Sequence, residues 1–104
     1  LIDSAANNHQ RFVRMQINKH LSLPQYQQNE WVSVQQYQQR KWIDIITLWV
    51  NYNGHLVHVL KNVNQATVLN TAEFPEYGIK TLEWLINDYI DHMEHHIKQM
   101  FPEN

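Results

Sequence analysis

The chain has 104 residues, enough for one domain whose folding would bury roughly two-thirds of its extended-chain surface. Hydrophobic residues make up 43% of it and aromatic residues 12%, which favours a packed interior over a disordered segment. The 8 Lys and Arg against 10 Asp and Glu give a formal net charge of −2, so nucleic-acid binding has no electrostatic support. The lack of Cys excludes disulfides, thiolate metal sites and cysteine nucleophiles.

The sequence also bears on location and fold class. The apolar stretch at residues 42–50 is broken by Asp44 and Thr47 and falls short of the ~18 residues of a membrane span. No signal peptide is visible and the chain starts at Leu1, so we expect a soluble, cytoplasmic protein that is cut at its front. With only two Gly and three Pro to form turns, a few long helices are favoured over a many-stranded fold.

The first predicted element is an amphipathic helix over residues 1–18. Its apolar residues recur at i, i+3 and i+4, and it lacks an N-cap of its own before Leu1, which places its true start upstream. Residues 19–28, with Pro24, are predicted to form a loop.

A long helix is predicted over residues 33–63, with a bend near residues 40–41. A wide apolar stripe from Trp42 to Val63 is expected to face a core. Pro75 and Gly78 indicate that residues 64–80 form a loop, with a short hairpin near residues 68–74.

The last helix is predicted to begin after Thr81 as N-cap, to continue to Met100 and to end before Pro102. Three long amphipathic helices without an internal repeat predict an all-α helical bundle. We therefore expect one domain over residues 1–104.

Seven residues of the chain are histidines, and two of them share a helical face. At ~100° per residue His92 and His96 differ by about 40°, which places both at the inward edge of the apolar stripe. Imidazoles at i and i+4 can reach one metal ion, and zinc or another divalent metal would suit them. The alternative is that both are core-edge residues held by hydrogen bonds.

A complete catalytic site needs a further ligand, because catalytic zinc usually has three protein ligands and one open position. His9 is the candidate within the chain, since it lies near Ala5 and Phe12 on the apolar face of the first helix. A core histidine with satisfied hydrogen bonds is the competing interpretation. His55 and His58 are interpreted as a polar face or a subunit contact.

Three segments together carry a resemblance to a known family. The first helix reads LIDSAANNHQRF, the last reads DYIDHMEHHIKQM, and the aromatic-rich WVSVQQYQQRKW lies between them. In this order they resemble the DinB/YfiT-like superfamily of metal-dependent enzymes over essentially the whole chain. The resemblance implies a four-helix bundle that lacks its first helix here.

The resemblance also implies a metal site. Family members bind a divalent metal, often nickel or zinc, through three His, and the two C-terminal ligands match His92 and His96. The first ligand falls immediately before Leu1, outside this sequence, so a two-His site is expected to be incomplete or empty in this chain. Asp91 or Glu94 would orient a metal-bound imidazole through a hydrogen bond.

A polar strip on the first helix contains Asp3, Asn7 and Arg11. The resemblance implies that these residues line the pocket, where the guanidinium fork of Arg11 would bind an anionic group of the substrate. A solvated surface strip is the alternative.

Two functions follow as hypotheses. The resemblance implies hydrolase-like or thiol-transferase chemistry on a small-molecule or thiol substrate, with a metal that activates water or the thiol, and no catalytic base is identified. The other hypothesis is a noncatalytic helical module that forms a homodimer through the face its missing helix would cover. Four tryptophans are large enough to anchor such a contact, namely Trp31, Trp42, Trp49 and Trp84, and a place in the core is the alternative for them.

Overall fold

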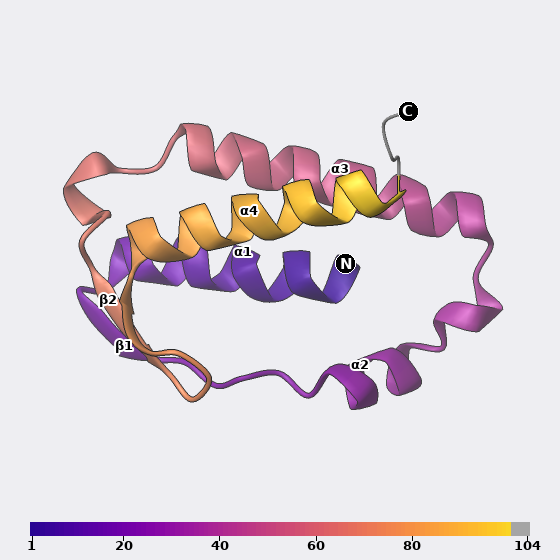
Figure 1. Ribbon diagram of the computed structural model, residues 1–104, viewed down its shortest axis with the longest axis horizontal. Helices are drawn as coiled ribbons and strands as arrows, with labels where there is room; N and C mark the ends of the chain where they lie inside the picture. Colours follow the sequence, from indigo (N-terminus) through magenta and orange to yellow (C-terminus); the bar gives the residue numbers. More distant parts are fainter. Residues whose placement is uncertain (101–104) are drawn as a thin grey trace.

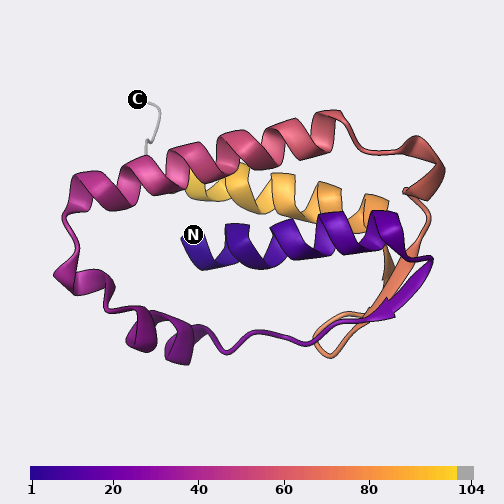
Figure 2. The same cartoon turned by 180° about the vertical axis from the view of Figure 1, so that it is seen from behind.

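Three long helices lie side by side, with a small sheet across one end of them (Figures 1 and 2). The computed structural model of the protein describes residues 1–100. α1 and α3 run in the same direction, and α4 returns antiparallel to both (Figure 1). The elements in chain order are α1 (Ile2–Ile17), β1 (His20–Ser22), α2 (Gln28–Gln35), the short 3-10 helix η1 (Tyr37–Gln39), α3 (Trp42–Lys61), the short 3-10 helix η2 (Gln65–Thr67), β2 (Thr71–Phe74), β3 (Gly78–Thr81) and α4 (Leu82–Met100).

The predicted helical character is confirmed, and the all-α class holds only roughly, because the chain also forms a small three-stranded sheet in the order β1-β2-β3. β1 pairs with β2 in parallel, with Leu21 opposite Ala72, and β2 pairs with β3 antiparallel. A hairpin was predicted near residues 68–74, but in the structure it lies later in the chain. Its first strand, β2, ends at Phe74, and its second strand, β3, begins at Gly78. Gly78 enters β3 with φ +76°, a left-handed conformation that favours glycine. A three-residue strand such as β1 shows no periodicity, so only its distant partner identifies it.

The predicted helix over residues 33–63 is interrupted. α2 ends at Gln35, Gln36 adopts a left-handed conformation with φ 55° and ψ 44°, and α3 begins only at Trp42. The bend predicted near residues 40–41 is therefore a complete break. α2 lies apart from the three long helices (Figures 1 and 2), and none of its described residues is buried. An eight-residue helix without an apolar partner has little to align it with α3.

The α2 segment is tied to α1 through one carboxylate. Asp3 Oδ1 accepts a hydrogen bond from Gln35 Nε2 at 2.8 Å and another from the Tyr37 hydroxyl at 2.5 Å. Burial and the hydrogen bond to Asp3 raise the pKa of Tyr37 to about 12. Tyr37 is thus a neutral donor at neutral pH, and Asp3 acts as a tether for the α2 segment.

The start of α4 matches the sequence prediction. Thr81 Oγ1 accepts a hydrogen bond from the backbone N–H of Trp84 at 3.1 Å, which confirms Thr81 as the N-cap. Pro102, which was predicted to end this helix, lies outside the described residues. Within residues 1–100, no helix is long and apolar enough to cross a membrane.

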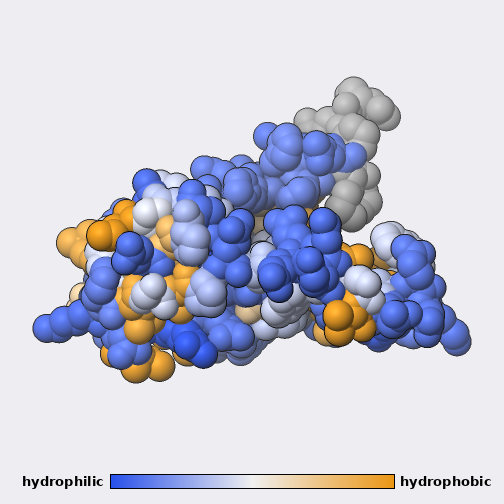
Figure 3. Space-filling view, turned by 90° about the horizontal axis from the view of Figure 1, so that it is seen from below, coloured by the Kyte–Doolittle hydropathy of each residue, from blue (hydrophilic) through white to orange (hydrophobic). Residues whose placement is uncertain are grey.

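The core lies where α1, α4 and the sheet meet. Its buried hydrophobic residues are Ala5, Phe12, Met15, Leu23, Leu56, Ala72, Phe74, Leu82, Leu85 and Tyr89. Leu56 is the one buried residue of α3 among the residues described, and Trp42 at its start is 69% exposed. The apolar stripe of α3 therefore faces the core only in part, because α1 and α4 cover one side of this helix. On the face seen in Figure 3 the surface is mainly hydrophilic, with separate hydrophobic patches toward its two ends.

Candidate functional site

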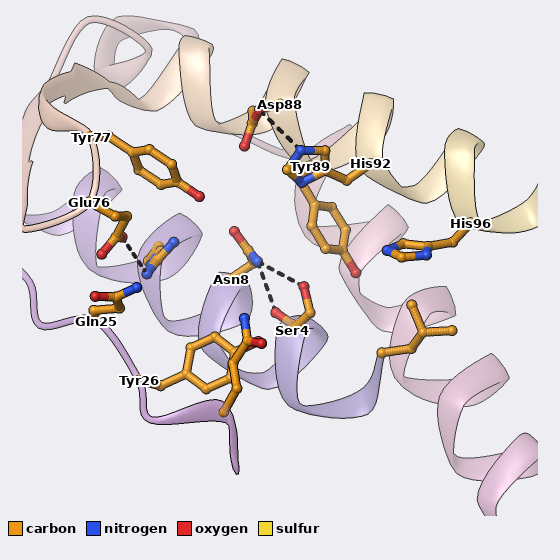
Figure 4. A pocket seen from close by; sticks show the side chains of 13 residues that line it. Ser4, Asn8, Gln25, Tyr26, Glu76, Tyr77, Asp88, Tyr89, His92 and His96 are labelled. Atoms are coloured by element: carbon orange, nitrogen blue, oxygen red, sulfur yellow. Dashed lines mark hydrogen bonds and ion pairs between the residues drawn. The ribbon is translucent and has the colours of Figure 1, made fainter. Parts of the chain in front are cut away.

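A polar pocket lies between α1, α4 and the two loops that carry Tyr26 and Tyr77 (Figure 4). Its volume is about 400 Å³, which is in the range of small-molecule sites. The residues that line it are Leu1, Ser4, Asn8, Arg11, Gln25, Tyr26, Gln28, Glu76, Tyr77, Asp88, Tyr89, His92 and His96.

His92 and His96 lie one turn apart on the α4 wall of the pocket (Figure 4). The side chain of His92 is 65% exposed, and its Nε2 lies 3.7 Å from Asp88 Oδ1, one turn earlier on the same helix. Both imidazoles are therefore accessible to a solute in the pocket. The structure thus places both histidines on one pocket wall, but it leaves both exposed, whereas the helical spacing predicted the inward edge of the apolar stripe.

Arg11 lines the same pocket, but its charge is already paired. Its Nη2 lies 3.2 Å from Glu76 Oε1, and the guanidinium also lies 4.8 Å from the centre of the Phe74 ring. The side chains of Arg11 and Glu76 are only 10% and 15% exposed. Because Glu76 neutralises it, Arg11 is less available to an anionic substrate than the family resemblance implies.

Other predicted site residues lie outside the pocket. The Asp3 carboxylate binds Gln35 and Tyr37, and the Asn7 side chain donates to the backbone carbonyl of Asp3 at 2.9 Å. Asn8, the next residue, lines the pocket instead of Asn7.

His9, the proposed third ligand, is not brought together with His92 and His96. Its Nδ1 lies 2.9 Å from the Tyr52 hydroxyl of α3, on a different face of α1 from the residues that line the pocket. Asp91 and Glu94 are exposed and do not line the pocket, whose α4 carboxylate is Asp88. Helical spacing could have identified Asp88, because it lies four residues before His92.

The three tyrosines of the pocket were not among the predicted site residues. Burial raises the pKa of Tyr77, and the carboxylates of Asp88 and Glu76 raise it further. Burial raises the pKa of Tyr89 to about 12, and its hydroxyl donates to Asn53 Oδ1 at 2.7 Å. The pocket therefore presents neutral phenols at neutral pH. Tyr26 and Tyr77 come from loops, whose positions carry no periodic signal in the sequence.

Two imidazoles with a nearby carboxylate suit a divalent metal in chemistry and in charge. Nevertheless, across residues 1–100 no group of three or more His, Cys, Asp or Glu side chains is placed so as to hold a metal ion. A metal ion at His92 and His96 would therefore need further donors beyond these described side chains.

The fold and the pocket define a mostly helical domain with a polar site of small-molecule size. No protein-family model matches the chain, and neither a curated protein nor a solved structure matches it.

Proposed function

We propose that the protein is a metal-dependent enzyme of the DinB/YfiT type, with hydrolase-like or thiol-transferase chemistry on a small molecule. The observation that carries this proposal is that His92 and His96 line one wall of a pocket of about 400 Å³. The sequence resemblance supports the same two residues as ligands of zinc or nickel. Leu1 also lines this pocket, and the resembled family has its third ligand immediately before this position.

In this proposal the side chains of the pocket divide into three groups. His92 and His96 hold the metal, and the Asp88 carboxylate keeps the His92 ring oriented. A bound divalent metal would supply Lewis acidity, which favours the ionised form of a water or a thiol. Ser4, Asn8 and the neutral phenol of Tyr77 offer hydrogen bonds to a polar substrate beside the histidines. Arg11 and Glu76 form a paired, neutral part of the wall rather than an anion site.

Metal titration by calorimetry tests this proposal, with zinc and nickel added separately to the full chain and to its variants. We expect the His92→Ala/His96→Ala variant to lose one equivalent of bound metal. His95→Ala is the matched control, because His95 lies on the same helix but does not line the pocket. Unchanged binding in the double variant would reject His92 and His96 as ligands.

A second candidate function is the noncatalytic module that forms a homodimer. The observation in its favour is the set of large apolar side chains exposed along α3. Ile43, Val50 and Val57 are 64%, 54% and 50% exposed, and their seven-residue spacing places them on one face. Sedimentation over a range of protein concentrations tests this function, and a strictly monomeric species at the highest concentration would contradict it.

A further inference from the structure

Three histidines lie together outside the pocket, where α1 contacts α3. The ring centres of His9 and His55 are 5.1 Å apart, and those of His55 and His58 are 6.2 Å apart. His9 is half-buried, whereas His55 and His58 are exposed on α3. The proposed function uses none of them, so the cluster needs an explanation of its own.

The closest pair has a spacing that suits a shared metal ion. With metal–nitrogen distances of about 2.1 Å and a tetrahedral angle, two imidazoles on one ion have ring centres roughly 5 Å apart. His9 and His55 have this separation and come from two different helices. His58 lies further away and its ring stacks at 27° to that of His55, so it would have to rotate to join them.

The hydrogen bond of His9 also fits a metal-binding histidine. Its Nδ1 lies 2.9 Å from the Tyr52 hydroxyl, which leaves Nε2 as the nitrogen available to an ion. A ligand histidine typically has its second nitrogen held by such a partner, which fixes the orientation of the ring.

The protonation state agrees with this arrangement. Burial lowers the pKa of His9, and the nearby imidazole of His55 lowers it further. His9 is therefore mainly neutral at neutral pH, the form in which imidazole binds metals.

We propose that His9 and His55 bind one divalent transition-metal ion, with water in its other positions. Copper, nickel and zinc are the class of ion expected, because imidazole sites favour the later first-row metals. The bound ion would link α1 to α3, the helices on either side of the pair, and would stabilise their packing. This site is independent of the pocket and of the proposed enzymatic function.

The test compares two variants in a background in which His92→Ala and His96→Ala have already removed the pocket histidines. One carries His55→Asn, which changes an exposed side chain that is expected to leave the fold intact. The control carries His20→Asn, because His20 is an exposed histidine that bonds to Thr71 in the sheet. Circular dichroism of all proteins without metal establishes that they are folded.

Copper or nickel chloride is then titrated while the histidine ring protons are followed by NMR. The proposal expects saturable binding of one equivalent, with selective broadening of the His9 and His55 signals. His55→Asn should weaken binding at least tenfold and remove the rise in melting temperature with metal, whereas His20→Asn should change neither. Equal affinity in the two variants, or no saturable binding once His92 and His96 are removed, would overturn the proposal. Neither result depends on whether the pocket is an active site.

Discussion

The pocket wall contains one largely buried ion pair, formed by Arg11 and Glu76. Their ion pair is largely buried, and Glu76 Oε2 has no hydrogen-bond partner among the described residues. Loss of Arg11 would leave this carboxylate without compensation in a poorly solvated place. We therefore expect the free energy of unfolding to fall more when one charge is removed than when both are removed together.

We expect Arg11→Met to lower the free energy of unfolding by about 3 kcal/mol, because it leaves a buried carboxylate unpaired. The Arg11→Met/Glu76→Met variant should lose less, since both charges are removed together. Urea unfolding of these two variants and of the Glu76→Met single variant measures these values. A double variant that loses as much as the two single variants combined would show that the residues act independently.

Tyr89 should make stability depend on pH in the alkaline range. Its pKa is raised from 10.0 to about 12 in the folded chain, mainly by burial, so the unfolded chain releases this proton first. The contribution of the protonated Tyr89 hydroxyl to the free energy of unfolding is complete below pH 10 and declines as the pH rises toward 12. We expect Tyr89→Phe to reduce this decline, and urea unfolding across this pH range measures it. Phenolate absorbance of the folded protein provides a direct check, because Tyr89 should be among the last tyrosines to ionise.

At the scale of elements, apolar periodicity and helix capping in the sequence predicted the long helices, but they did not predict that α2 is a separate helix. α1 and α4 have apolar faces that are buried, and Thr81 caps α4 as its sequence position predicted. By contrast, α2 has no buried residue among those described, and it is placed by the bonds of Asp3 to Gln35 and Tyr37. These bonds join residues far apart in the sequence, so helical periodicity could not reveal the break before α3.

Removal of the α4 cap tests the local part of this explanation. Thr81→Ala should lower the free energy of unfolding by about 1 kcal/mol, because the Trp84 N–H loses its acceptor. Thr81→Ser keeps a hydroxyl oxygen and should retain most of the stability. Thermal unfolding of the two variants side by side makes the comparison, and equal losses would show that the hydroxyl is not what stabilises this end of α4.

At the scale of the whole molecule, α3 contacts the core through one buried side chain, that of Leu56, and three partly buried ones, those of Tyr52, Val59 and Leu60. Leu56 is 1% exposed and belongs to the core, whereas its neighbour Val57 is 50% exposed. The hydrogen bond from Tyr89 to Asn53 adds a polar link between α4 and α3. Leu56 is therefore the side chain of α3 that contributes most fully to the core.

Two adjacent substitutions test this contribution. Leu56→Ala should lower the free energy of unfolding by about 3 kcal/mol, because it leaves a cavity in the core. Val57→Ala should change it by no more than about 0.5 kcal/mol, since an exposed side chain loses little on truncation. Equilibrium denaturation of both gives the difference. Similar losses for the two variants would mean that the outer face of α3 is also covered in solution.

The sequence by itself determined α1, α4, the part of the second predicted helix that forms α3, the cap at Thr81 and the spacing of His92 and His96 by one turn, because each depends on residues within one or two turns. Tertiary structure alone decided that Glu76 neutralises Arg11, that Tyr26 and Tyr77 close the pocket, and that His9 faces Tyr52 and His55. It also decided the sheet, since β1 is too short to show a pattern and forms only against β2. Such features join segments far apart in the chain, and their free energy comes from contacts that local spacing does not encode.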